Sequence, residues 1–200
     1  MTLVAPATEP CLRTRRGPAL ALPGHRWLMP PSPADHRLLA RVAGPVLDVG
    51  CGPARHVLAL AQAGIVALGI DCSPPAITIA RRRGAPVLHR SIFDRVPGAG
   101  RWGTALLLDG NVGIGGCPVT LLRRVTSLLR ADGRILLELQ AGRGTADVEH
   151  VRFELGCHAG PWFPWAHVGV DDLDDLADRA ELTIRDRWRD TGRWFAWLER

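Results

Sequence analysis

The sequence contains no lysine and no tyrosine, and its 200 residues include a single asparagine, Asn111. Without lysine the chain cannot form a P-loop of the G-x-x-x-x-G-K-[ST] type, because the lysine of that motif reaches the bound phosphates. All 25 basic residues are therefore arginines, and the net charge is +5. An all-arginine set is typical of GC-rich codon usage, so this charge alone does not indicate a nucleic-acid partner.

The chain also lacks an apolar run near the roughly 18 residues that a membrane-spanning helix needs, so no membrane partner is expected. Its five cysteines are odd in number and scattered, and no two of them form a C-x-x-C pair. This pattern argues against a disulfide framework or a zinc cluster and predicts a reducing, cytoplasmic location. No group of His, Cys and Asp has metal-ligand spacing, so no metal is expected.

Residues 1–33 are rich in proline and glycine and predict an irregular N-terminal arm, followed by one domain over residues 34–200. In that domain, near-continuous apolar runs alternate with segments of helical periodicity. Such alternation predicts an α/β fold with a single doubly wound, Rossmann-like sheet whose parallel strands are covered on both faces. The five expected strands lie at residues 45–50, 65–71, 85–90, 104–110 and 134–140.

After residue 140 the pattern changes. A stretch rich in glycine and tryptophan (141–170) precedes an acidic segment of helical periodicity at residues 170–180. Two further apolar runs, 182–190 and 193–200, are separated only by Thr191 and Gly192. Strands joined by so short a connection are antiparallel neighbours, so the domain is expected to end in a helix and a strand hairpin.

The segment VLDVGCGPARH, Val46 to His56, places a G-x-G turn directly after the first strand. Glycine tolerates positive φ and has no Cβ, so a ligand can approach the backbone closely there. The dinucleotide-binding fingerprint needs a third small residue where this chain has Arg55. The turn is therefore expected to hold a nucleotide-like ligand without a pyrophosphate.

Asp71 ends the second strand, nineteen residues beyond Gly52. An acidic side chain at this place can accept hydrogen bonds from both ribose hydroxyls of an adenosine group. The alternative is an ordinary turn or helix-capping aspartate, but the glycine turn beside it favours the ribose interpretation.

These residues resemble a known family. VLDVGCGPAR (46–55) looks like the first motif of class I S-adenosylmethionine (SAM)-dependent methyltransferases, and GIDCS (69–73) resembles their second. By this resemblance Asp48 orients the SAM amino group, directly or through water, Gly50 and Gly52 flank the methionine and ribose, and Asp71 binds the ribose. The full cofactor-binding set is then Asp48, Gly50, Cys51, Gly52, Asp71, Cys72, Ser91, Ile92 and Asp109.

The adenine contact departs from the family pattern. Such enzymes often place an aspartate and then an apolar residue after the third strand, where this chain has Ser91 and Ile92, with Asp94 three residues beyond Ser91. Ile92 is expected to pack on the ring and Ser91 to make a weak hydrogen bond. Asp94 has the alternative role of capping a turn.

The fourth strand ends LLLDGNVGIGG, and in this fold that end lies beside the reactive methyl group. Asp109 and Asn111 are therefore predicted to act in catalysis, with the Asn111 amide holding the acceptor; a turn asparagine is the alternative. The segment lacks the [DNS]-P-P-[YF] signature of many enzymes that methylate nucleobase or amide nitrogens.

The stretch CHAGPWFPWAHVG (157–169) follows the fifth strand, where this fold often inserts a substrate-covering element. Its aromatic residues Trp162, Phe163 and Trp165 are predicted to wall a planar or apolar acceptor. His158 or His167 is predicted to deprotonate an acceptor hydroxyl. The alternative is a loop that packs its aromatic side chains on the sheet.

The sequence thus predicts a SAM-dependent methyltransferase that acts on a small molecule by direct displacement, with proximity and alignment as the main contributions of the enzyme. Two alternatives stay open: a SAM-binding accessory or regulatory protein without transferase activity, and an RNA methyltransferase. The run Arg81–Arg83 does not favour RNA, since cations at the end of a helix face its dipole favourably. The sequence does not determine the oligomeric state.

Overall fold

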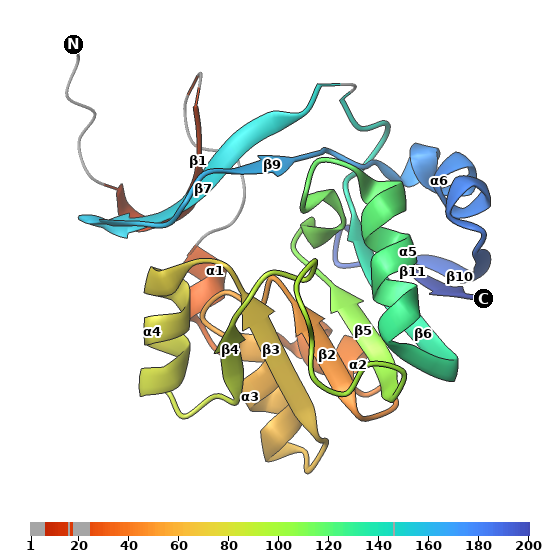
Figure 1. The fold of residues 1–200 in the computed structure, drawn as a ribbon, viewed down its shortest axis with the longest axis horizontal. Helices are drawn as coiled ribbons and strands as arrows, with labels where there is room; N and C mark the ends of the chain where they lie inside the picture. The colour runs from red at the N-terminus through yellow and green to blue at the C-terminus, as the bar shows by residue number, and fades with distance from the viewer. Residues whose placement is uncertain (1–6, 16, 18–24, 146) are drawn as a thin grey trace.

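The computed structural model describes residues 7–15, 17, 25–145 and 147–200. Within them the largest sheet has seven strands, five of which run parallel: β2 (Val46–Val49), β3 (Ala67–Asp71), β4 (Val87–His89), β5 (Trp102–Leu107) and β6 (Leu129–Leu139). The strands β10 (Thr183–Asp190) and β11 (Arg193–Glu199) continue the sheet in antiparallel orientation beside β6. The order across the sheet is β10-β11-β6-β5-β2-β3-β4 (Figure 1). The expected α/β fold with a mostly parallel sheet is confirmed.

Helices cover both faces of this sheet. One face packs against α2 (Pro33–Leu39), α3 (Arg55–Gln62) and α4 (Pro74–Arg82), and the other against α5 (Pro118–Leu128) and α6 (Leu173–Ala180). Local sequence fixes where the helices begin: Ser32 forms a capping box with Asp35 at α2, and the Ser73 hydroxyl caps α4. No helix in the described residues is long and apolar enough to cross a membrane.

A second, antiparallel sheet corrects two expectations, the single sheet and the irregular N-terminal arm. It consists of β1 (Ala7–Thr14), β7 (Glu149–Gly156), β8 (His158–Ala159) and β9 (Phe163–Trp165), and we call it the roof sheet. In the arm, β1 pairs with β7 so that Leu12 lies opposite Phe153, and α1 (His25–Leu28) follows. The strand forms because the buried Leu12 packs in one apolar cluster with Trp27 and Phe153.

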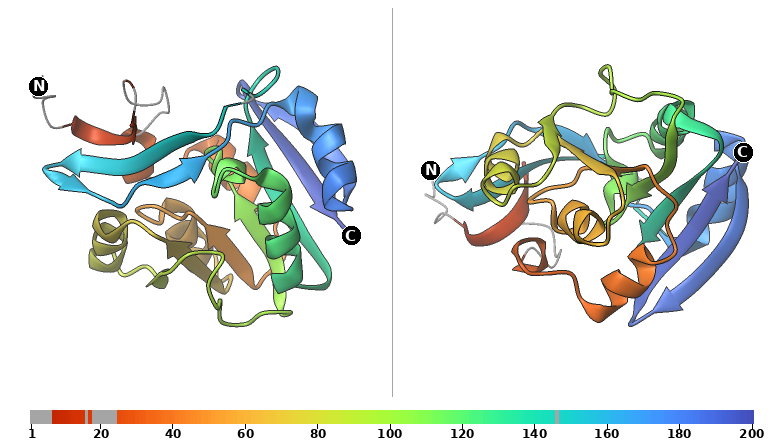
Figure 2. Two further views of the ribbon diagram at one scale, coloured as in Figure 1. Left: turned by 45° about the horizontal axis from the view of Figure 1, so that its top comes forward. Right: turned by 90° about the horizontal axis from the view of Figure 1, so that it is seen from below.

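The roof sheet lies beyond the carboxyl ends of the parallel strands, as Figures 1 and 2 show. It is tied to the main body through the loop after β5, which contains the 3-10 turn η1 (Asn111–Gly113). Gly115 N donates to the Pro164 carbonyl at 2.9 Å, and Ala166 N donates to the Gly113 carbonyl at 2.9 Å. This arrangement closes a space above the strand ends, where ligands bind in open α/β sheets.

Candidate cofactor and acceptor site

A cavity of about 390 Å³ lies between the strand ends and the roof sheet. This volume is within the usual range for a small-molecule site. The structure brings most of the predicted site residues to its walls: Gly50, Cys51, Gly52, Asp71, Cys72, Ser91, Ile92, Asp109, Asn111, Phe163 and Trp165.

The turn after β2 is shaped by a close approach of Asn111. Gly50 has φ +71°, and a Cβ there would lie 2.7 Å from Ile114 Cδ1 and 2.8 Å from Asn111 Nδ2. Asn111 Nδ2 donates to the carbonyls of Val49 at 2.8 Å and Gly50 at 2.9 Å. Both N–H bonds of the amide therefore hold the turn, so in this structure Asn111 positions the glycine turn and has no amide donor left for an acceptor.

Asp71 lies at the end of β3 with its carboxylate fixed from two sides. Its Oδ2 accepts from Gly52 N at 2.8 Å, and its Oδ1 accepts from Ser73 N at 2.7 Å. Burial raises the pKa of Asp71 above its usual value even though these backbone hydrogen bonds oppose the shift. A carboxylate accepts about four hydrogen bonds, so two remain for ligand hydroxyls.

The loop after β4 forms the next wall. Ser91 and Ile92 line the cavity, and Asp94 Oδ2 accepts from Ser91 N at 3.3 Å, which makes Asp94 a turn cap. Phe93, which the sequence analysis missed, also lines the cavity and is 45% exposed. Its ring lies over Gly115, where a Cβ would come within 2.7 Å of Phe93 Cε2. This wall thus presents an apolar edge to a ligand.

Asp109 is paired with the arginine that excludes a dinucleotide fingerprint. Arg55 Nη1 lies 2.7 Å from Asp109 Oδ2, and Nη2 donates to Oδ1 at 2.9 Å. Burial alone would raise the pKa of Asp109, but the Arg55 guanidinium outweighs it and holds the pKa below its usual value. The carboxylate on this wall is therefore ionised at neutral pH.

Asp48 lies before the glycine turn and is not among the described residues that line the cavity. It is 1% exposed, its Oδ2 lies 3.9 Å from His56 Nδ1, and this oxygen has no hydrogen-bond partner among the described residues. Burial raises the pKa of Asp48 to about 7, against the opposing effect of Arg55. Burial also lowers the pKa of His56 to about 3, so the imidazole is neutral.

Besides Asp48, three predicted residues lie away from the described cavity walls. The Trp162 ring lies instead near two guanidinium groups, with Arg152 Cζ at 4.7 Å and Arg15 Cζ at 5.4 Å from its centroid. The ring nitrogens of His167 lie 3.1 Å from Gln140 Nε2 and 3.1 Å from Glu149 Oε2. His158 is exposed in the roof sheet. We therefore omit all three from the proposed chemistry.

The roof sheet and α1 supply cavity-lining residues that the sequence analysis missed: Leu12 on β1, Phe153 on β7 and Trp27 on α1. A signal for β7 was present, since apolar Val151 and Phe153 alternate with polar residues as in a half-buried strand. No comparable pattern marks Trp27, which contributes through its 5.9 Å ring contact with Phe153. No group of three or more His, Cys, Asp or Glu side chains in the described residues could hold a metal ion.

Known proteins share this arrangement. A family model described as a methyltransferase domain matches residues 46–96, which run from β2 to the loop after β4. A SAM-dependent methyltransferase from Bacteroides fragilis, solved with S-adenosyl-L-homocysteine (SAH), is 24% identical with a TM-score of 0.76, over 96% of this chain and 88% of that chain. The chain therefore shares the fold of this SAM-dependent methyltransferase, and its residues 46–96 match the sequence model of a methyltransferase domain.

Two other methyltransferases share the fold at lower identity. The 1,6-didemethyltoxoflavin-N1-methyltransferase of Burkholderia thailandensis, with 1,6-didemethyltoxoflavin and SAH bound, is 21% identical with a TM-score of 0.57, over 82% of this chain and 74% of that chain. The glycopeptide N-methyltransferase MtfA with SAH is 13% identical with a TM-score of 0.62, over 86% of this chain and 90% of that chain.

Proposed function

We propose that this methyltransferase transfers the methyl group of SAM to a small-molecule acceptor held under the roof sheet. The observation that carries the proposal is the cavity, which joins two unlike walls. One wall is the glycine turn with Asp71 and Asp109, and the other is the apolar face of the roof sheet. A donor and an acceptor can therefore lie side by side in one enclosed space.

On the cofactor side, Asp71 accepts hydrogen bonds from the ribose hydroxyls, using the lone pairs that Gly52 N and Ser73 N leave free. Ile92 and Phe93 contact the adenine ring through their apolar surfaces. The turn at Gly50, fixed by Asn111, leaves room for the methionine part, and the ionised Asp109 carboxylate favours a cationic sulfonium nearby.

On the acceptor side, Trp165 and Phe163 form an aromatic corner above the loop after β5. Their ring centroids are 6.0 Å apart with an interplanar angle of 64°. Trp165 Cζ2 lies 3.4 Å from the position that a Cβ on Gly110 would occupy, so the indole covers the turn between Asp109 and Asn111. A planar, largely apolar acceptor fits this corner. The neighbour that binds 1,6-didemethyltoxoflavin supports a small-molecule acceptor of this kind.

SAM supplies an electrophilic methyl group, and the residues of this chain align the two reactants and exclude water. Alignment converts a bimolecular displacement into an effectively unimolecular step, and a misplacement of about 1 Å can cost on the order of 100-fold in rate. The apolar residues Leu12 and Phe153 of the roof sheet and Trp27 of α1 line the cavity and reduce the access of water. A cytoplasmic location fits this proposal, since all five cysteines are free thiols.

The test combines SAH titration by calorimetry with transfer of labelled methyl from SAM to a panel of planar aromatic metabolites. Wild-type protein should bind SAH and label at least one acceptor. Asp71→Asn should weaken SAH binding at least about tenfold, because a hydrogen bond to a charged group contributes roughly 1.5–3 kcal/mol. Asp132→Asn, at an exposed carboxylate paired with Arg130, is the matched control and should bind like wild type.

Two outcomes would favour the alternatives. SAH binding without labelled product from any acceptor would indicate a SAM-binding protein without transferase activity. Methyl transfer to RNA, with an affinity that falls steeply with salt, would indicate an RNA methyltransferase. Equal SAH affinity in wild type and Asp71→Asn would remove Asp71 from the ribose site.

A further inference from the structure

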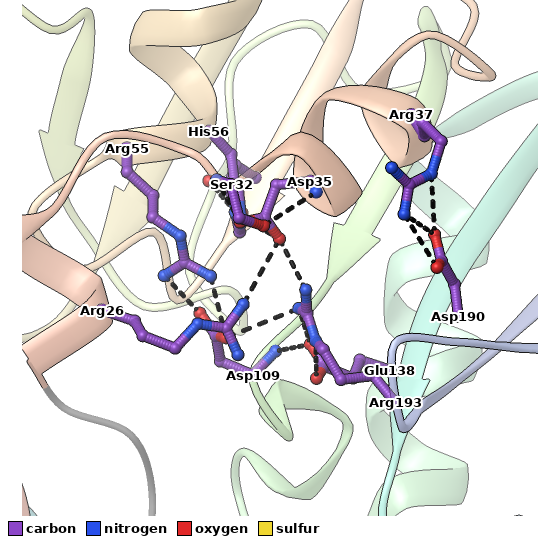
Figure 3. Close-up of polar contacts among 11 residues, drawn as sticks. Arg26, Ser32, Asp35, Arg37, Arg55, His56, Asp109, Glu138, Asp190 and Arg193 are labelled. Carbon is purple, nitrogen blue, oxygen red and sulfur yellow. Dashed lines mark hydrogen bonds and ion pairs between the residues drawn. The ribbon is translucent and has the colours of Figure 1, made fainter.

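A buried cluster of charged side chains joins the C-terminal hairpin to the cavity (Figure 3). Arg193, the first residue of β11, lies at its centre with a side chain that is 12% exposed. Its Nη1 donates to Asp35 Oδ1 at 2.6 Å. Its Nε and Nη2 donate to the two carboxylate oxygens of Glu138 at 2.7 and 2.6 Å. Arg193 thus holds Glu138, on β6, in one orientation.

Glu138 in turn binds the backbone of the cavity wall. Its Oε2 accepts from Asp109 N at 2.8 Å. Asp109 has φ +55°, in the left-handed region that residues other than glycine seldom adopt. Such a conformation persists only where the surroundings hold it. Here Glu138 holds the N–H of Asp109, and Arg55 holds its carboxylate from the opposite side.

The conformation of Asp109 also sets the next residues. Gly110 follows directly, and Asn111 then donates to the carbonyls of Val49 and Gly50. A continuous series of contacts therefore runs from Arg193 through Glu138 and Asp109 to the glycine turn.

We propose that Glu138 and Arg193 are positioning residues of the methyl-transfer site, which hold Asp109 in its left-handed conformation and thereby the turn that Asn111 fixes. This inference rests on the proposed function. Stability alone does not account for the cluster, because a buried ion pair is often no more stabilising than apolar side chains of similar volume. What apolar side chains cannot supply is an acceptor aimed at the Asp109 N–H.

The test compares two substitutions of Glu138. Glu138→Met removes the acceptor and should weaken SAH binding on the order of tenfold, because the cavity wall shifts. Glu138→Gln keeps an oxygen for the Asp109 N–H and should bind SAH within about threefold of wild type. Arg37→Met is the matched control, since it removes an exposed bidentate ion pair with Asp190 of the same hairpin. Arg37 makes no contact with Asp109 among the described hydrogen bonds and ion pairs. The control substitution should leave SAH affinity unchanged.

A second readout needs no cofactor. In the ligand-free protein, the amide proton of Asp109 donates to a carboxylate, and its NMR resonance should move upfield in Glu138→Met and much less in Glu138→Gln. If Glu138→Met fails to fold, Arg193→Lys takes its place, because lysine cannot form a bidentate hydrogen bond with both oxygens of Glu138. The Asp109 resonance should then shift in the same direction but by a smaller amount. An unchanged Asp109 resonance would overturn the proposal. If wild type binds no SAH, the proposed function fails, whereas the resonance still decides the positioning role.

Discussion

At the scale of single residues, Asp48 is a buried carboxyl group whose ionised form the fold does not satisfy. Burial raises the pKa of Asp48 to about 7, whereas an aspartate in an unfolded chain has a pKa near 3.9. Between about pH 4 and pH 7 the folded state therefore binds a proton that the unfolded state lacks, so this group makes the protein less stable as pH rises.

Asp48→Asn should remove that dependence. Thermal unfolding should show the variant to be more stable than wild type above pH 7, by at least about 1 kcal/mol, with the difference vanishing near pH 4. His56, with its pKa near 3, has the opposite effect: it lowers the free energy of unfolding as pH falls below about 6.5. This effect is present in both proteins, so it cancels when the two are compared. A constant difference across this pH range would show that Asp48 is ionised throughout.

At the scale of elements, the roof sheet covers one side of the cavity without being part of the two main apolar clusters. Deleting residues 1–14 removes β1 and the contact of Leu12 with the cavity. The seven-stranded sheet and its helices should stay folded, because their cores do not include β1. Turnover should fall because an opened cavity admits water and no longer encloses the reactants.

Circular dichroism would measure whether the shortened protein stays folded, and methyl-transfer assays would measure its turnover. The substitution Leu12→Ala removes the same cavity contact without shortening the chain. It should lower turnover with little change in the main unfolding transition. Cys11→Ala, on the same strand but outside the cavity lining, is its control. If the shortened protein keeps full activity, β1 is not needed for turnover, and the remaining strands of the roof sheet are sufficient.

At the scale of the whole molecule, the features that could be predicted from the sequence are those that local patterns encode. The parallel sheet follows from apolar runs alternating with helical periodicity, and the turn at Gly50 is visible as G-x-G after a strand. The roof sheet was missed because β1 pairs with β7 from the far end of the chain, and no short-range pattern marks such a partner. Glu138 and Arg193 were missed for the same reason: an ion pair between strands has no periodicity, and only the fold brings it to Asp109.

Binding of the cofactor should be measurable as stabilisation of the whole molecule, because the cavity is built from β2, β3, the loop after β5 and the roof sheet together. At an SAH concentration about 100 times its Kd, linkage adds roughly 2.7 kcal/mol to the free energy of unfolding. For a chain of this size that corresponds to a rise in Tm of roughly 5–10 °C. NADH is the control ligand and should give no shift, since Arg55 and its ion pair with Asp109 occupy the place where a dinucleotide site needs a small residue. An equal shift with NADH would contradict the assignment of the turn to SAM, and no shift with saturating SAH would contradict the cofactor site as a whole.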